Sequence, residues 1–318
     1  MDCGPIFIGG LSRCGKTLIG SLLSAHPNIA IPRKELNLWT KYYRMYGDLN
    51  QLKNIDRCLA AMLHYKSIVR LNPNIDNIRN EFCQGQKSYS RLFDLFLTHY
   101  SERIGKRRWG IHSVCIDYYT DFIFSAFPTA KMIYTIRDPR DRYAEQITTR
   151  RARLGGKVAI ASFNWLYSLS LAEKKHVQYP QRYQIIRYET LVAEPKKTIQ
   201  SICKFLNEDF SPLESVMQDF SSYKGKEIST AFIGGYRKRM SKLEIAFMQA
   251  NTKPQMLTYK YETETISFSI YDTHLYHFGF QPFNFIVIVF WRFLKFIYRR
   301  FPVPMKYFGK SPIMYPIR

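Results

Sequence analysis

The stretch Pro5-Ile-Phe-Ile-Gly-Gly-Leu-Ser-Arg-Cys-Gly-Lys-Thr-Leu-Ile19 decides the fold of this chain. Residues 5–8 are apolar and predict a buried strand, residues 9–16 predict a glycine-rich loop, and apolar residues from position 18 onward have helical spacing. In a strand, loop and helix of this kind, the loop N–H groups and the helix N-terminus converge on one point. The sequence therefore predicts a cradle for a phosphate-type anion.

The letters of this loop fit a nucleotide-binding pattern. Gly10, Gly15, Lys16 and Thr17 have the Walker A spacing, in which the lysine contacts the terminal phosphates and the threonine binds magnesium. That interpretation gives a P-loop kinase that uses ATP and magnesium. No strand ending in a lone aspartate accompanies the loop, which disfavours ATP. A glycine turn that binds nothing is the structural alternative.

The same loop also resembles the 5′-phosphosulfate loop of sulfotransferases that use 3′-phosphoadenylyl sulfate (PAPS), among them the tyrosylprotein, glycan and bacterial enzymes. In that family Arg/Lys-Ser-Gly-Thr-Thr is followed by a helix and then His-Pro. The counterparts here are Arg-Cys-Gly-Lys-Thr at 13–17 and His-Pro at 26–27. The resemblance implies a set of PAPS-binding residues in the loop: Arg13, Cys14, Gly15, Lys16, Thr17 and Leu18.

A second motif follows the apolar strand predicted at 131–136. The chain continues as Arg-Asp-Pro-Arg-Asp-Arg at 137–142, and polar residues at the carboxyl end of a parallel strand face a ligand. This run is similar to the 3′-phosphate motif of the family, which implies that Arg137 grips that phosphate through paired hydrogen bonds. Glu145 stands where the family has a serine, so its carboxylate must point away or meet a cation. The expected cations are Arg150, Arg151 and Arg153.

Two residues are candidates for the chemical step. Glu35 follows a short apolar piece at 29–31 and would face the loop from the end of a second strand. In the sulfotransferases that this stretch resembles, a glutamate at about this distance deprotonates the acceptor hydroxyl; a solvated glutamate is the alternative. His112 stands where the family's lysine neutralises the departing phosphate oxygen, and a structural histidine is an equal alternative.

Two later segments extend the resemblance. Tyr188 ends the strand predicted at 183–188, where the family's tyrosine lies near the adenine, although taken alone it is typical of a core aromatic. The run 229–239 resembles the segment that closes over the nucleotide. Arg237 and Lys238 would then replace the family's basic residue, which is glycine here. A solvated basic loop is the alternative.

Composition points to anionic partners. Lys and Arg number 47 against 25 acidic residues, a net charge of +22 that favours polyanions, an anionic cofactor or an acidic membrane surface. We expect no nucleic acid among the partners. The 6 cysteines have neither pairing nor metal-ligand spacing, so we expect reduced thiols, no metal and a cytoplasmic protein. The first strand begins near residue 5, which leaves no room for a preceding signal peptide or anchor.

The C-terminal stretch differs from the rest. Residues 283–301 are almost wholly apolar and aromatic, with Arg292, Lys295 and Arg299 at helical spacing on one side. This pattern is typical of an interfacial helix on an anionic membrane, and the uncharged run is too short to span a bilayer. A helix buried against the domain is the equal alternative.

Together these observations predict an α/β fold with a P-loop NTPase-like parallel β-sheet flanked by helices and a C-terminal aromatic and basic helical extension. The expected division is a catalytic domain at 1–262 and the extension at 263–318. The resemblance implies a sulfotransferase that moves a sulfuryl group from PAPS to an acceptor hydroxyl, with Glu35 as general base. The acceptor is a small molecule, glycan, lipid or peptide, and the location is cytoplasmic and peripheral at a membrane. The alternatives are a P-loop kinase and a non-catalytic protein that binds membranes or polyanions. Three further residues would assist the transfer: Arg13, Lys16 and His112.

Overall fold

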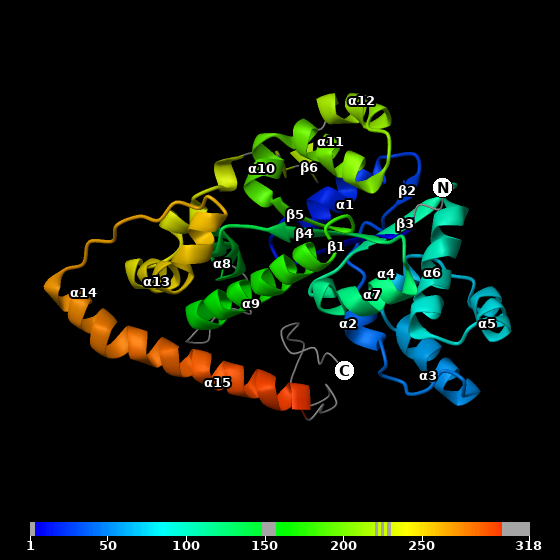
Figure 1. Ribbon diagram of the computed structural model, residues 1–318, viewed down its shortest axis with the longest axis horizontal. Helices are drawn as coiled ribbons and strands as arrows, with labels where there is room; N and C mark the ends of the chain where they lie inside the picture. The colour runs from blue at the N-terminus through cyan, green and yellow to red at the C-terminus, as the bar shows by residue number, and fades with distance from the viewer. Residues whose placement is uncertain (1–3, 148–156, 220–221, 224–225, 228–229, 301–318) are drawn as a thin grey trace.

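The computed structural model describes residues 4–147, 157–219, 222–223, 226–227 and 230–300. Its centre is a five-stranded sheet with the order β2-β3-β1-β4-β5, in which all neighbouring strands are parallel. The strands are β1 Ile6–Gly10, β2 Ile29–Ala30, β3 Arg108–His112, β4 Lys131–Ile136 and β5 Tyr183–Arg187. Helices cover both faces of the sheet, so the predicted fold class is confirmed (Figure 1).

The position of β1 places the phosphate loop at the middle of one sheet edge. Ile8 of β1 aligns with His112 of β3 on one side and with Ile133 of β4 on the other. Because the strands are parallel, the carboxyl ends of these three strands meet at the same edge. Open α/β sheets bind ligands at that edge, and each predicted ligand-facing turn begins there.

Alternation of side chains along β1 gives the sheet two separate cores. Ile6 and Ile8 pack in one hydrophobic cluster, and Phe7 packs in another on the opposite face. The first cluster lies under α1 Lys16–Ser24, α10 Tyr188–Ala193, α11 Pro195–Leu206 and α12 Ser211–Asp219 (Figure 1).

The second cluster takes in the helices between β2 and β3 together with two later helices, α7 Thr120–Ala126 and α9 Lys157–Gln178. The helices between β2 and β3 are α2 Leu38–Tyr42, α3 Leu52–Leu63, α4 Lys66–Val69, α5 Ile75–Gln84 and α6 Tyr89–Arg103. Trp39 of α2 packs edge-on against Phe7, at 5.1 Å between ring centroids. This contact ties the helical cap directly to the strand that precedes the phosphate loop.

A third, smaller cluster covers the side of the sheet next to β4. It joins α8 Pro139–Ile147 to α9 and α13 Lys242–Thr258, and it includes the 3₁₀ helix η3 Gly235–Lys238. A short antiparallel pair, β6 Ser222–Tyr223 and β7 Lys226–Glu227, precedes η3. These elements bring the late part of the chain over the turn that follows β4.

The predicted C-terminal helix is present as α15 Gln281–Arg300. It continues from α14 Ile270–His274 and the π-helical turn η4 Leu275–Phe280, and it lies along α9 at the lower edge of the molecule (Figure 1). Asn284 is buried, and Val287 and Ile288 pack toward the third cluster. Among the described residues, no helix is both long and apolar enough to cross a membrane. The proline-rich run after Arg300 lies outside them.

Candidate functional site

The phosphate loop leaves its anion-facing donors free. Gly15 has a left-handed φ of 93°, and a Cβ there would lie 2.7 Å from Cδ2 of Tyr188, so the turn requires glycine. α1 begins at Lys16 without a side-chain N-cap. Among the described residues, no hydrogen bond uses the backbone N–H groups of Gly15, Lys16 or Thr17. Three donors at a helix N-terminus therefore face the edge of the sheet.

Lys16 connects this loop to the candidate base. Its ammonium is 5% exposed, donates to the carbonyl of Leu11 at 2.8 Å, and lies 3.8 Å from Oε1 of Glu35. The backbone around Glu35 is held at two points. The Leu36 N–H donates to the carbonyl of His112 (3.2 Å), and the Tyr65 hydroxyl donates to the carbonyl of Glu35 (2.9 Å). A partly exposed carboxylate is thus fixed beside the lysine of the loop.

His112 lies at the carboxyl end of β3 and is buried. Its imidazole packs against α1, where a Cβ on Gly20 would approach Cδ2 at 3.1 Å. The next residue, Ser113, donates to Oδ1 of Asn37 at 2.6 Å and so ties the end of β3 to the segment that carries Glu35. The fold brings the phosphate loop, Glu35 and His112 to adjacent strand ends.

Arg137 reaches back from β4 to the loop. It is buried, and it donates to the carbonyls of Arg13 (3.1 Å) and Phe232 (3.2 Å). Its guanidinium lies 4.4 Å from the centroid of the Tyr188 ring, a cation–π contact, and its Nε has no hydrogen-bond partner. The Trp165 indole donates to the Arg137 carbonyl (2.9 Å) and fixes the turn. The loop, the second motif and Tyr188 therefore form one site.

The remaining loop residues contribute differently. Arg13 is exposed, with a left-handed φ of 69° that turns its carbonyl toward Arg137. Cys14 is buried, and this burial raises the pKa of its thiol. Leu18 packs its side chain in the core, and its N–H already donates to the carbonyl of Gly15 (2.9 Å). Thr17 is half-buried at the start of α1.

The Glu145 carboxylate pairs with a cation, as the sequence predicted, but this cation belongs to a residue that the motif did not indicate. The partner is Arg239, at 2.6 Å. Arg150, Arg151 and Arg153 lie outside the described residues. The pair borders a cavity of about 30 Å³ at this point. The cavity is lined by Arg137, Asp141, Ala144, Glu145, Phe232, Gly235 and Arg239.

The closing segment is held in place by α8. The Asp141 carboxylate accepts from the backbone N–H groups of Gly234 (2.8 Å) and Tyr236 (3.0 Å), and burial raises its pKa. Arg237 pairs with Glu264 at 3.3 Å, and Lys238 is exposed. Arg239, three residues after Tyr236 in η3, lines the cavity instead. Arg239 directly follows Arg237 and Lys238 in the same basic run, which was the signal that could have identified it.

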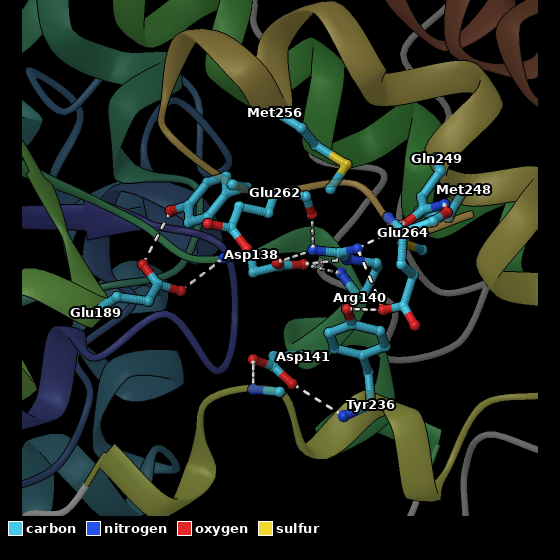
Figure 2. A network of polar contacts seen from close by, with 12 residues as sticks. Asp138, Arg140, Asp141, Glu189, Tyr236, Met248, Gln249, Met256, Glu262 and Glu264 are labelled. Carbon is cyan, nitrogen blue, oxygen red and sulfur yellow. Dashed lines mark hydrogen bonds and ion pairs between the residues drawn. The ribbon is translucent and has the colours of Figure 1, made fainter. Parts of the chain in front are cut away.

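Arg140 is the centre of a satisfied polar network (Figure 2). It pairs with Asp138 (2.7 Å), donates to Gln249 (2.6 Å) and to the carbonyl of Glu262 (2.7 Å), and stacks 4.2 Å from the ring centroid of Tyr236. The ring of Tyr236 is buried in this network, with its hydroxyl bonded to Glu264. Arg140 therefore pairs with the carboxylate of Asp138, the residue that follows Arg137 at the end of β4.

Sequence reasoning also missed a buried acid beneath the loop. Asp117 lies in the 3₁₀ helix η1 Ile116–Tyr119, where a Cβ on Gly9 would lie 3.5 Å from its Oδ1. Burial raises the pKa of Asp117 to about 6. The Ser168 hydroxyl donates to Oδ2 at 3.4 Å, and Oδ1 has no hydrogen-bond partner. No motif in the sequence singles out this residue.

The comparisons with known proteins agree with this geometry. No curated protein matches the chain. The chain is similar to the sulfotransferase domain of the Synechococcus PCC 7002 olefin synthase, with 21% identity, a TM-score of 0.58 and coverage of 82% of this chain and 96% of that one. It is also similar to the sulfotransferase domain from the curacin biosynthetic pathway, with 18% identity, a TM-score of 0.54 and coverage of 82% and 99%. These likenesses show the fold. The model of the sulfotransferase family matches residues 5–212, more than half of the chain, so this protein belongs to the sulfotransferase family.

Proposed function

We propose that this protein transfers a sulfuryl group from PAPS to an acceptor hydroxyl, with Glu35 as the general base. Family membership indicates a transferase. The observation that carries the finer proposal is the Glu35 carboxylate, held by its backbone 3.8 Å from the Lys16 ammonium at the mouth of the loop. A base beside the anion cradle is the arrangement that acyl-, phosphoryl- or sulfuryl-type transfer to a hydroxyl requires.

The residues present fit the donor. Three unused N–H groups at the start of α1 suit a phosphosulfate, and the unpartnered Nε of Arg137 suits a second phosphate. Arg137 and Tyr188 would hold the 3′-phosphate and the adenine. The proposed contacts around them come from Arg13, Cys14, Gly15, Lys16, Thr17, Leu18, Glu145, Arg237 and Lys238, with Arg239 added by the structure.

The donor would supply an activated sulfuryl group bound to its 5′-phosphate. Glu35 would take the proton of the acceptor hydroxyl as the new S–O bond forms and the bond to the phosphate oxygen breaks. Lys16, Arg13 and the loop N–H groups stabilise the negative charge that grows on that oxygen. His112 assists from the end of β3. The acceptor is a small molecule, glycan, lipid or peptide.

One contact disfavours the kinase alternative. A P-loop kinase needs a carboxylate near the loop to hold magnesium. The Asp138 carboxylate, which follows β4, accepts from both Nε and Nη2 of Arg140, at 3.1 and 2.7 Å. This carboxylate is committed to the network in Figure 2.

Calorimetric binding of 3′-phosphoadenosine 5′-phosphate (PAP) tests the donor site. We expect the wild-type protein to bind PAP equally with and without magnesium and to bind ATP more weakly. Arg137→Ala should lose at least tenfold in PAP affinity, because a charge-assisted phosphate contact disappears. Arg70→Ala, at an exposed arginine that ends α4, is the matched control. Preference for ATP with magnesium, or indifference to Arg137→Ala, would refute the donor assignment.

Substitution of Glu35 tests the base. Glu35→Gln should keep PAP affinity within about twofold and lower the turnover of labelled PAPS over a panel of hydroxyl acceptors by about 10²–10⁴-fold. The exposed Glu102→Gln should behave as wild type. Unchanged turnover in Glu35→Gln would remove this residue from the mechanism.

A separate observation favours association with a membrane. The outer face of α15 is apolar, with Phe285, Ile286 and Phe296 60%, 65% and 65% exposed. Arg292 lies at the border of this face, over the Phe163 ring of α9 (5.8 Å). An apolar face with basic residues beside it, on a chain of net charge +22, suits an anionic lipid surface. The proposal comprises a cytoplasmic, peripherally bound enzyme with a catalytic domain at 1–262 and an extension at 263–318.

Vesicle co-sedimentation of the full chain tests this association. Binding should be stronger to phosphatidylcholine vesicles containing phosphatidylserine than to phosphatidylcholine alone, and it should weaken with salt. The double variant Ile286→Asp with Phe290→Asp should lose binding. Leu52→Asp, at a 54% exposed leucine on α3, should retain it. Equal sedimentation of the double variant would exclude α15 as the contact.

A further inference from the structure

Arg142 of α8 differs from the other buried arginines in how few partners its guanidinium has. The described residues contain four arginines in the buried class: Arg108, Arg137, Arg140 and Arg142. Arg108 and Arg140 each form a buried ion pair, at 3.1 and 2.7 Å, and Arg137 donates to two carbonyls. Arg142 is 4% exposed, and its Nε and Nη1 have no hydrogen-bond partner. Among the described residues, no carboxylate pairs with its guanidinium.

A buried guanidinium without a counter-charge disfavours folding. Removing the cation from water is not repaid by an ion pair or by hydrogen bonds. Burial accordingly lowers the pKa of Arg142, yet an arginine retains its proton in proteins. The folded chain therefore carries an unneutralised positive charge whose donors are directed into its interior.

The location of this charge is the inner side of the phosphate loop. The ionisable groups that act on Arg142 are Cys14 in the loop, Tyr134 of β4 and Cys115, which follows β3. Arg142 also exerts the largest charge effect on the Cys14 thiol, ahead of Lys16. Arg142 lies one turn into α8, which begins directly after β4, so it is close to the edge where this sheet binds ligands.

We propose that Arg142 binds an oxyanion during the reaction. This inference rests on the proposed function. The oxyanion is either the sulfuryl group of the donor or an anionic substituent of the acceptor, such as a carboxylate, phosphate or sulfate. Both would neutralise a planar cation that offers parallel N–H donors. Arg142 and Arg137 both act on the Cys14 thiol of the loop, and Arg142 would hold the reacting or acceptor end of the ligand while Arg137 holds the nucleotide end.

The first test uses the ligand-free protein. Arg142→Met preserves the length of the side chain and removes its charge. We expect a higher thermal midpoint for this variant than for wild type, since an unpaired buried charge is eliminated. Inorganic sulfate should raise the midpoint of wild type more than that of the variant. The exposed Arg70→Met should match wild type in both respects.

The second test distinguishes the two sources by calorimetry and kinetics. Arg142→Met should bind PAP, which has no sulfuryl group, within twofold of wild type. A tenfold loss of PAPS affinity would assign the oxyanion to the donor. Unchanged PAPS affinity with a tenfold higher KM for anionic acceptors, and no change for neutral ones, would assign it to the acceptor.

Failure of the inference and failure of the proposed function give different results. If wild type binds no PAP but sulfate stabilises it through Arg142, the donor assignment fails and the oxyanion site stands. If Arg142→Met is no more stable than wild type, responds equally to sulfate, and keeps its affinity for PAPS and its KM for every acceptor, Arg142 binds no oxyanion.

Discussion

Two buried polar regions, one around Arg140 of α8 and one near the phosphate loop, differ in how completely their charges are partnered. Around Arg140, every charged group meets an opposite charge or a hydrogen-bond partner, and residues from α8, η3 and α13 are joined into one network (Figure 2). Near the phosphate loop, Nε and Nη1 of Arg142 and Oδ1 of Asp117 have no hydrogen-bond partner among the described residues. The satisfied region holds elements together, whereas in the unsatisfied region Arg142 is left for the proposed oxyanion.

Removal of Arg140 should give the largest effect, because it breaks the satisfied region. Arg140→Met leaves the Asp138 carboxylate buried without its cation, which should lower the free energy of unfolding by about 3–5 kcal/mol. Urea titration of the ligand-free protein measures this loss. The exposed Arg70→Met should change stability by less than about 0.5 kcal/mol. A small loss in Arg140→Met would erase the distinction between the two regions.

Asp117 should give a pH-dependent effect from the unsatisfied region. Burial raises its pKa from 3.8 to about 6, so between these values the folded protein holds a proton that the unfolded chain releases. Stability from this group is complete below pH 4 and is lost as the pH rises through 6. Asp117→Asn does not titrate, so its unfolding free energy relative to wild type should rise by about 2 kcal/mol between pH 4 and 7. A difference independent of pH would contradict the assignment.

Alanine variants of two glycines would distinguish the effect of backbone strain from the effect of contact with the proposed nucleotide site. Gly15 (φ 93°) abuts Tyr188, whereas Gly105 (φ 72°) has nothing within 4 Å of the Cβ position. Both alanine variants should lose about 1 kcal/mol from the left-handed conformation. Only Gly15→Ala should also lose PAP affinity, because its methyl group displaces Tyr188. Equal PAP binding by both variants would argue that this ring does not contact the nucleotide.

We expect the smallest change in stability from substitution of the Glu145–Arg239 ion pair at the rim of the cavity. The Glu145–Arg239 ion pair is partly exposed, so Glu145→Gln should change stability by at most about 1 kcal/mol. Its PAP affinity should nevertheless rise severalfold, because a carboxylate leaves the cavity and Arg239 is released. Arg239→Gln should weaken PAP binding. Calorimetry that gives the opposite order would show that Glu145 serves the site by orienting Arg239.

The sequence was sufficient for what local patterns encode. The strand, loop and helix around Gly15, the ligand-facing turn at Arg137 and the C-terminal helix each follow from a short run of residues, and all are present. The sequence also predicted that Glu145 needs a cationic partner. It could not predict which residue this partner is, because Arg239 lies 94 residues away and contacts Glu145 only through the packing of η3 on α8.

The partners of the other buried charges were unpredictable for the same reason. Arg140 and Arg142 are neighbours in one motif, and no local signal says which of them will find a carboxylate. Arg140 pairs with Asp138 of the same motif, and its further partners Gln249 and Glu264 arrive from α13 and the segment after it. The roles of Glu35, His112, Arg237 and Lys238 stay predictions, since the structure gives their positions and not their ligands.

The sheet order also determines when the site can exist during synthesis. β1 is made first, yet it pairs with β3 and β4, and its loop is completed by Arg137, Tyr188 and Phe232. At a translation rate of about 5–20 residues per second, the strand waits on the order of 10 s for these neighbours. During that interval the nascent chain exposes an apolar strand with no partner. Binding of the proposed nucleotide would therefore report that most of the chain has been made and has folded.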